Sequence, residues 1–309
     1  MTNKEIIQKA DMALADLASG GQMTPEQATK FIEMMQDTPT ILHSARVEPM
    51  AKAQTEINKI GFNSRILHPA PSGRVALADG ERSKPTTERI KLDPQKVQAE
   101  VFLDDEVIDN NIEGENIFDT IMRLAAERSA LDLEELVVQG DKSSADPYLA
   151  LIDGVLKQAN THVVDFKSEA LSRDVFKQAY KATPQKYIRN PRDWRFYTSH
   201  HAALEWMDQV AARQTGLGDR ALEGGGATAY GVNVEGISMM QPYDDGAGKS
   251  VSDILFTHPK NIIIGIRRDI TVEYERNIRE QGWTIVITAK IDAKFEEEDA
   301  TAKVIKVQS

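Results

Sequence analysis

Four short motifs in the sequence contain residue types that can do chemistry. The first, Gly248-Lys249-Ser250, has the ending of a phosphate-binding loop, in which backbone amides and a lysine hold the phosphate groups. That loop needs a second glycine five residues before Gly248, where Tyr243 stands. Asp244 and Asp245 would repel a phosphate, and the following residues predict a strand instead of the helix that such a loop requires. We interpret the motif as a surface turn.

The other three motifs are weaker. Gly236-Ile237-Ser238 begins like the nucleophile elbow of a hydrolase, but Met240 replaces the second glycine. His201 and Glu205 are one helical turn apart, which supplies too few ligands for a metal ion. Asp104-Asp105-Glu106 is typical of a solvated turn. The sequence therefore predicts no catalytic, cofactor-binding or metal site and no cofactor, so a soluble metabolic or nucleotide-binding enzyme is disfavoured.

The composition excludes further classes of protein. The chain of 309 residues has no cysteine, which rules out disulfides and thiolate metal sites and fits a reducing cytoplasm. No run of about 18 apolar residues is present, and the N-terminus lacks the apolar core of a signal peptide, so we expect no membrane partner. The net charge of −11 argues against a chain that coats nucleic-acid phosphates, because such binding relies on clustered lysine and arginine.

Residues 97–140 predict the element around which the chain is organised. Alternating apolar residues at 97–103 predict a half-buried strand. A helix over 116–139 follows, with Asn116 as N-cap and Gly140 as its end. Its expected apolar stripe consists of Ile117, Ile121, Leu124 and Ala125, continued by Leu131 and Leu136.

Residues 64–96 contain four prolines and little that could form a core. Strand-like segments at 65–67 and 88–92 flank a polar tip at 79–85, which predicts a long two-stranded ribbon. A two-stranded ribbon is marginal in water, so we expect it to lie on a neighbouring subunit. A disordered surface loop is the alternative.

The remaining segments predict an α+β fold in which helices and strands are largely segregated. Helices are expected at 3–18, from 24, at 172–182 and at 199–213, the last with Leu204, Met207 and Val210 on one face. The first two form either a helical hairpin packed on the body or an arm that grips a neighbour. Residues 283–295 alternate strictly, which predicts one long strand that is bent or shared between two sheets.

Three of these stretches together resemble the major capsid proteins of tailed bacteriophages, which have the Hong Kong 97-like shell fold shared by encapsulins. The first is the strand, acidic turn and long helix ending at Gln139-Gly140-Asp141. The second runs from Leu171 through Pro184-Gln185-Lys186-Tyr187 to Trp194. The third comprises the closing strands 254–265, 270–274 and 283–307.

The resemblance implies a subunit with four parts. These are an N-terminal arm (1–45), an extended β-hairpin loop (64–96), a peripheral domain with a spine helix (46–63, 97–150 and 246–309, helix 116–139) and an axial domain (151–245). The extended loop would lie over the next subunit, and the glycine-rich loop at 214–231 would lie near a five- or six-fold axis. The interface candidates are Arg82, Lys84, Arg89, Lys91, Gly216, Gly218, Gly224, Gly225 and Gly226.

The function implied by the resemblance is structural. The chain would self-assemble into pentamers and hexamers of an icosahedral head around double-stranded DNA, without sequence-specific binding. It would be made and assembled in the host cytoplasm, would reside in the virion, and could meet scaffolding, portal and decoration proteins. An encapsulin-like shell around a protein cargo is the alternative. Some family members link a lysine of the extended loop to an asparagine of a neighbour; Lys84, Lys91 and Asn261 are available, but no motif supports a link and we predict none.

Overall fold

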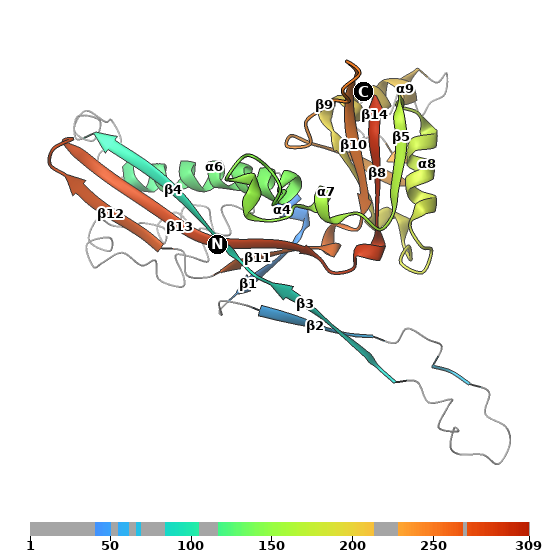
Figure 1. Ribbon diagram of the computed structural model, residues 1–309, viewed down its shortest axis with the longest axis horizontal. Helices are drawn as coiled ribbons and strands as arrows, with labels where there is room; N and C mark the ends of the chain where they lie inside the picture. The colour runs from blue at the N-terminus through green and yellow to red at the C-terminus, as the bar shows by residue number, and fades with distance from the viewer. Residues whose placement is uncertain are drawn as a thin grey trace, which may run out of the picture.

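The protein is described by a computed structural model at residues 41–50, 55–61, 66–68, 84–104, 117–212, 228–267 and 271–308. Two bodies, each built on a β-sheet, lie side by side, and a two-stranded ribbon projects from the region where they meet (Figure 1). The two N-terminal helices, the N-cap Asn116, residues 79–83 of the predicted tip and most of the glycine-rich loop were predicted in segments outside the described residues.

The first body is a five-stranded sheet organised on one long strand, β13 (Gly282–Phe295). Along one edge β13 pairs antiparallel with β4 (Gln95–Asp104), and it also pairs antiparallel with β12 (Thr271–Asn277) and then with β11 (Ile262–Arg267). β1 (Arg46–Met50) adds to β11 in parallel. The alternation predicted at 283–295 is confirmed as a strand. Its sharing between two sheets is wrong, because all its partners lie in one sheet, where β13 curves (Figure 1).

Helix α6 (Ile117–Gln139) confirms the helix predicted over 116–139. It packs on one face of this sheet. The apolar residues that it buries are Ala126, Ala130, Leu133, Leu136, Val137 and Val138. Leu124 was predicted on this stripe but is 54% exposed. The buried positions lie mostly in the second half of the helix, where the sheet and the second body both contact it. Leu124 lies beside the exposed Arg123, on a side of the helix that misses the core contacted by Ile121 and Ala125.

Gly140 ends the helix as predicted. Its amide donates to the carbonyl of Leu136 at 3.0 Å, and its carbonyl accepts from the amide of Gly154 at 2.8 Å. A Cβ on Gly140 would lie 2.5 Å from the Leu136 carbonyl oxygen, and one on Gly154 would lie 2.7 Å from the Gly140 nitrogen. Two glycines are therefore required here, because two backbone segments touch.

The second body is a seven-stranded sheet in the order β5-β14-β10-β6-β8-β7, with β9 paired to β10. Its strands are β5 (Val163–Ala170), β6 (Arg195–Ser199), β7 (Thr228–Ala229), β8 (Val232–Ile237), β9 (Tyr243–Asp244), β10 (Ser250–Thr257) and β14 (Thr301–Gln308). Helices α8 (Arg173–Ala182) and α9 (His200–Ala211) share one core with this sheet, rich in the rings Phe176, Trp194, Phe196, Trp206 and Phe256. Both helices were predicted.

The predicted face of α9 is confirmed in part. Met207 and Val210 pack against this core beside the buried Ala202 and Trp206, whereas Leu204, which was predicted on the same face, is 64% exposed. Trp206 packs on Phe176 of α8, with ring centroids 4.7 Å apart, so contact with the neighbouring helix decides how α9 is rotated.

The chain crosses between the two bodies several times. Short helices lie at or near these crossings and the turns: α4 (Ile41–Ser44), η3 (Leu149–Leu151), α7 (Val155–Gln158), η4 (Pro191–Asp193), η5 (Pro259–Asn261) and η6 (Glu298–Ala300). The prediction that 246–309 joins 97–150 in one unit is wrong for β10 and β14, which pair in the seven-stranded sheet. Their apolar pattern identifies them as buried strands but does not say which sheet they enter.

Candidate assembly surfaces

The turn that resembled a phosphate-binding loop is filled by its own carboxylates. The amides of Gly246 and Gly248 donate to Asp244 Oδ1 at 2.8 and 3.2 Å, and those of Ala247 and Lys249 donate to Asp245 Oδ1 at 2.7 and 3.3 Å. These are the backbone donors that an anion would need. The turn joins β9 to β10 and is a surface turn, as the sequence predicted.

The other motif residues are dispersed. Ser238 lies 3.2 Å from His200, between Oγ and Nε2, while His201 and Glu205 are exposed on α9. In the described part of the chain, no three histidine or carboxylate side chains gather where they could hold a metal ion. Nor is any helix there long and apolar enough to span a membrane.

A cavity of about 480 Å³ lies where the end of α6 meets β10 and β14. Its charged groups bond to one another or to the backbone. Lys157 lies 2.8 Å from Asp141, a hydrogen bond that lowers the pKa of Asp141 to about 2, and Lys303 donates to the carbonyl of Leu156 at 2.7 Å. Burial raises the pKa of Asp253, which accepts from Tyr243 at 2.8 Å. The cavity is therefore a polar junction whose charges are already engaged.

The ribbon consists of β2 (Thr55–Gly61) and β3 (Thr86–Leu92), paired antiparallel from Thr55 opposite Leu92 to Gly61 opposite Thr86. The predicted second strand at 88–92 is confirmed within β3. The predicted first strand at 65–67 is wrong, because residues 66–68 form no regular structure and β2 precedes them. The ribbon therefore begins before the predicted boundary at residue 64.

One face of the ribbon is exposed to solvent in the part of the chain that the structure describes. Alternate residues of a strand point to opposite faces, and the exposed face carries Glu56, Asn58, Ile60, Thr87, Arg89 and Lys91. Ile60 is 70% exposed, which is unusual for a large apolar side chain on a strand. The predicted interface residues Arg89 and Lys91 lie on this face, and Lys84 is exposed just before β3. Arg82 and the five glycines lie outside the described residues.

The opposite face of the ribbon is fastened to the body at its root. Leu92, Met50 and Ile263 form a small buried core, against which Ile57 and Ile90 pack. A Cβ on Gly265 would lie 2.8 Å from the sulfur of Met50, so the glycine makes room for this core.

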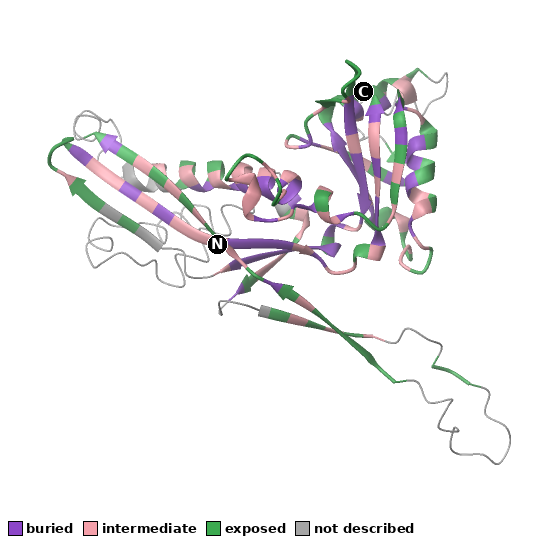
Figure 2. Ribbon diagram, viewed as in Figure 1, coloured by how far each residue is buried: buried purple, intermediate pink, exposed green. Residues whose placement is uncertain are grey.

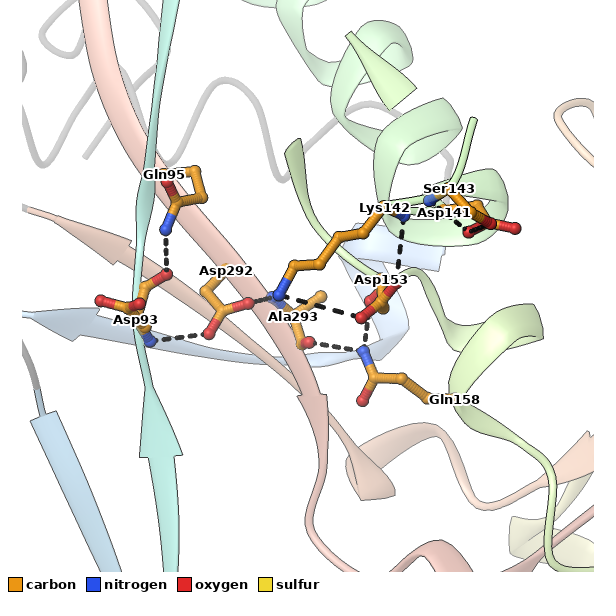
Figure 3. A network of polar contacts seen from close by, with 9 residues as sticks. All are labelled: Asp93, Gln95, Asp141, Lys142, Ser143, Asp153, Gln158, Asp292 and Ala293. Carbon is orange, nitrogen blue, oxygen red and sulfur yellow. Dashed lines mark hydrogen bonds and ion pairs between the residues drawn. The ribbon is translucent and has the colours of Figure 1, made fainter. Parts of the chain in front are cut away.

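A network of polar contacts surrounds the same root (Figure 3). Asp292 of β13 accepts from the amide of Asp93 at 2.8 Å and from the amide of Ala293 at 2.9 Å. Burial raises the pKa of Asp292. The carbonyl of Ala293 in turn accepts from the side chain of Gln158 at 2.8 Å, so the network joins the ribbon, the long strand and α7.

No described helix or strand covers the face of the five-stranded sheet opposite α6 over β4, β13 and β12, and we call this surface the open sheet face. In Figure 2 these strands lie in front of α6 and are mostly exposed or intermediate. Phe102 is 46% exposed here, and its ring takes the space above Gly282, where a Cβ would lie 2.5 Å from Phe102 Cζ. A hollow of about 650 Å³ at the end of this face is lined by Glu273, Glu275, Arg276, Asn277, Ile278, Arg279, Thr284 and Val286.

Sequence reasoning missed the structural roles of the polar residues that hold the ribbon and the crossings, namely Lys59, Asp292, Asn261 and Glu297. Each acts with a partner on another element. A charged or amide residue inside an apolar strand pattern, such as Asp292 between Ile291 and Ala293, is the signal that could have identified one of them.

Comparison with known proteins shows which family the chain resembles in sequence and in fold. Residues 20–304 match the family described as "Phage capsid family". The Bacillus subtilis (strain 168) protein named "Putative prophage capsid protein YqbE" is 51% identical, with all of both chains covered. The fold is similar to a chain of the satellite phage P4 procapsid, with a TM-score of 0.67, 14% identity and coverage of 100% of this chain and 98% of that one. The SrpI encapsulin of Synechococcus elongatus PCC 7942 gives a TM-score of 0.55, 12% identity and 85% coverage of each chain.

The fold and the open surfaces thus define a structural protein that forms a shell. The chain belongs to the phage capsid family. It is a major capsid protein of a phage or prophage head and not an enzyme, with the α+β fold of Hong Kong 97-like capsids. Membership of this family implies a homo-oligomeric shell and a place in the virion.

Proposed function

We propose that the chain assembles into pentamers and hexamers of an icosahedral head that encloses double-stranded DNA. The observation that carries this proposal is the ribbon β2–β3, whose outer face bears the exposed residues Ile60, Arg89 and Lys91 and packs against no core formed by the described residues. A two-stranded ribbon is marginal in water by itself, so a second copy is the natural support.

The open sheet face is the surface on which we place a neighbour's ribbon. It carries the acidic residues Glu100, Glu273 and Glu275, which complement Lys91 on the ribbon and, beside it, Arg89, whose guanidinium lies 3.2 Å from Glu56 of the same ribbon face. Exposed charges of opposite sign steer association and set its register more than they add affinity. A modest contact suffices, because a closed shell repeats it in every subunit.

The four predicted parts take the following roles in the proposal. The five-stranded body with α6 is the peripheral domain, and the seven-stranded body is the axial domain. Residues 1–45 are the N-terminal arm, and the ribbon with the segment between its strands is the extended loop. The glycine-rich loop, including Gly216, Gly218, Gly224, Gly225 and Gly226, lies near the symmetry axis, where one sequence must fit both five- and six-fold surroundings.

A covalent link through Asn261 is not part of the proposal. Asn261 is 8% exposed, its Nδ2 donates to Thr257 Oγ1 at 3.1 Å and to the carbonyl of Glu297 at 2.9 Å, and its Oδ1 accepts from the amide of Glu297 at 2.9 Å. This amide is fully engaged inside the subunit, which supports a structural role for it.

DNA is expected to fill the shell without adhering to it. The chain carries a net charge of −11, so acidic residues on the inner wall would repel the phosphates within the short screening distance of physiological salt. Scaffolding, portal and decoration proteins are further proposed partners, with assembly in the host cytoplasm.

Electron microscopy of purified particles, combined with quantification of nuclease-protected nucleic acid, tests the proposal. Closed shells that protect duplex DNA in a virion preparation support it. Shells that hold a folded protein cargo instead would favour an encapsulin-like compartment, and a monomer that forms no rings at any salt concentration would overturn both.

A further inference from the structure

We infer that an ion pair between Lys59 and Glu297 fixes the direction in which the ribbon leaves the body, and that Lys59 is therefore a positioning residue for assembly. The structural half of this inference concerns a single subunit. Its consequence for assembly rests on the proposed function.

Glu297 is a rigid anchor because its backbone is held on both sides. It lies between β13 and η6, where the chain crosses from one sheet to the other. Its amide and its carbonyl both bond to the side chain of Asn261, at 2.9 Å each, and Asn261 belongs to the other crossing, between β10 and β11. The side chain of Glu297 therefore extends from a point at which two crossings are tied together.

Lys59 reaches this anchor from the ribbon. It lies on the ribbon face that points to the body, opposite Glu88, and its Nζ is 3.6 Å from the Glu88 carboxylate and hydrogen-bonded to that of Glu297. The side chains of Lys59 and Glu297 are only 29% and 26% exposed. A pair so shielded is screened less by salt than a fully exposed surface pair.

The ion pair is a second point of attachment. The first is the root, where Leu92 is buried and Asp93 bonds to Asp292. Lys59 lies opposite Glu88, four residues beyond Leu92, or about 13 Å further along the ribbon at ~3.3 Å per residue. One attachment at the root would leave the ribbon free to swing about it, and the second removes that freedom.

The absence of cysteine makes a distance measurement straightforward. Spin labels at Thr87→Cys, on the outer ribbon face, and Gln178→Cys, on the exposed side of α8, report the ribbon's position in unassembled full-length subunits. A second pair, Glu127→Cys with Gln178→Cys, reports the relative position of the two bodies. The test variant is Glu297→Gln, which removes the charge but keeps the backbone bonds to Asn261.

The matched control is Glu296→Gln. It removes the same charge from the adjacent residue, whose carboxylate lies 3.7 Å from Arg46 of β1 and not on the ribbon. We expect Glu297→Gln to broaden the distance distribution between ribbon and α8 while leaving the distribution between the two bodies unchanged. Glu296→Gln should leave both distributions unchanged. Salt at about 1 M, where the Debye length is only ~3 Å, should still broaden the ribbon distance in labelled protein that keeps Glu297, which tests the pair even where Glu297→Gln fails to fold.

Two results would overturn the inference. One is a ribbon distance that stays the same in Glu297→Gln and in high salt. The other is a broadening of both distances together, which would mean that the crossing itself had loosened. These measurements use unassembled subunits, so they stand apart from the proposed function, which is decided by whether the unsubstituted protein forms DNA-filled shells.

Discussion

The carboxylate of Asp292 accepts a hydrogen bond at 2.8 Å from the backbone amide of Asp93, at the corner where β3 passes into β4. Asp292 follows Ile291, which is the residue of β13 that pairs with both β4 and β11. The ribbon is thus fastened to β13 next to the residue at which pairing with β4 ends and pairing with β11 begins. Asp292 therefore links the most exposed element of the subunit to its core.

Replacing Asp292 with alanine should lower the free energy of unfolding by about 1–3 kcal/mol, because two amides in a buried place lose their acceptor. Asp292→Asn should cost less, since one oxygen remains. Urea denaturation of unassembled subunits, followed by tryptophan fluorescence, measures both. Glu100→Ala, on the exposed face of β4, is the control. Equal midpoints for Asp292→Ala and Glu100→Ala would contradict the structural role of this carboxylate.

Glu134 offers a prediction about pH. It is buried in α6, accepts from the amide of Ile41 at 3.1 Å, and has a pKa raised by burial and by the nearby charge of Glu235. The folded state therefore binds this proton more tightly than the unfolded state does. Stability should fall as pH rises through the interval between the ordinary glutamate pKa and the raised one.

Glu134→Gln should accordingly stabilise the subunit at neutral pH, since it keeps an acceptor for Ile41 and removes a buried charge. The gain should vanish in acid, where Glu134 itself is neutral. Unfolding midpoints measured across the acidic to neutral range test this, with the exposed Glu127→Gln as control. A variant less stable than the original protein at neutral pH would show that the charge is needed.

Local periodicity explains what the sequence could predict. β13, α8 and the extent of α6 follow from alternation, helical spacing and a glycine at the helix end, which are properties of neighbouring residues. The family resemblance rested on the order of these elements and gave the correct class of function.

Contacts between distant residues explain what could not be predicted. Asp93 and Asp292 are 199 positions apart, and Lys59 and Glu297 are 238 apart, so no window of sequence contains both partners. The strand pattern at β2 is short and is interrupted by Lys59 and Gly61. The first ribbon strand was therefore predicted at the apolar pair Ile66-Leu67 instead. Alternation also does not reveal that β10 and β14 belong to the seven-stranded sheet, while β11, β12 and β13 between them in the sequence belong to the five-stranded sheet.

The glycine pair at the end of α6 gives a third prediction. Gly140→Ala and Gly154→Ala should each destabilise the subunit by about 1–3 kcal/mol or more, because the added Cβ meets backbone atoms that cannot move aside as a side chain would. Gly61→Ala, where a Cβ would meet nothing within 4 Å, is the matched control and should leave the thermal midpoint nearly unchanged. Wild-type midpoints in the first two variants would contradict the close approach of the two backbones.

The last prediction separates folding from assembly. Deleting residues 79–85 removes the predicted tip of the ribbon, beyond the last described pair, Gly61 with Thr86. The cores of both bodies contain described residues from elsewhere in the chain, so the unfolding midpoint of the subunit should not change. Shell yield should fall, because the ribbon loses reach over its neighbour.

Electron microscopy and size-exclusion chromatography of the deletion variant measure that loss. A second variant, in which 79–85 are replaced by seven glycine and serine residues, keeps the length and removes the side chains. If length alone matters, this variant should restore shells that the deletion loses. If charged side chains such as Arg82 make the contact, it should fail as the deletion does. Shells formed at normal yield by the deletion variant would show that the tip is dispensable, and the support for the ribbon would then have to come from β2 and β3 themselves.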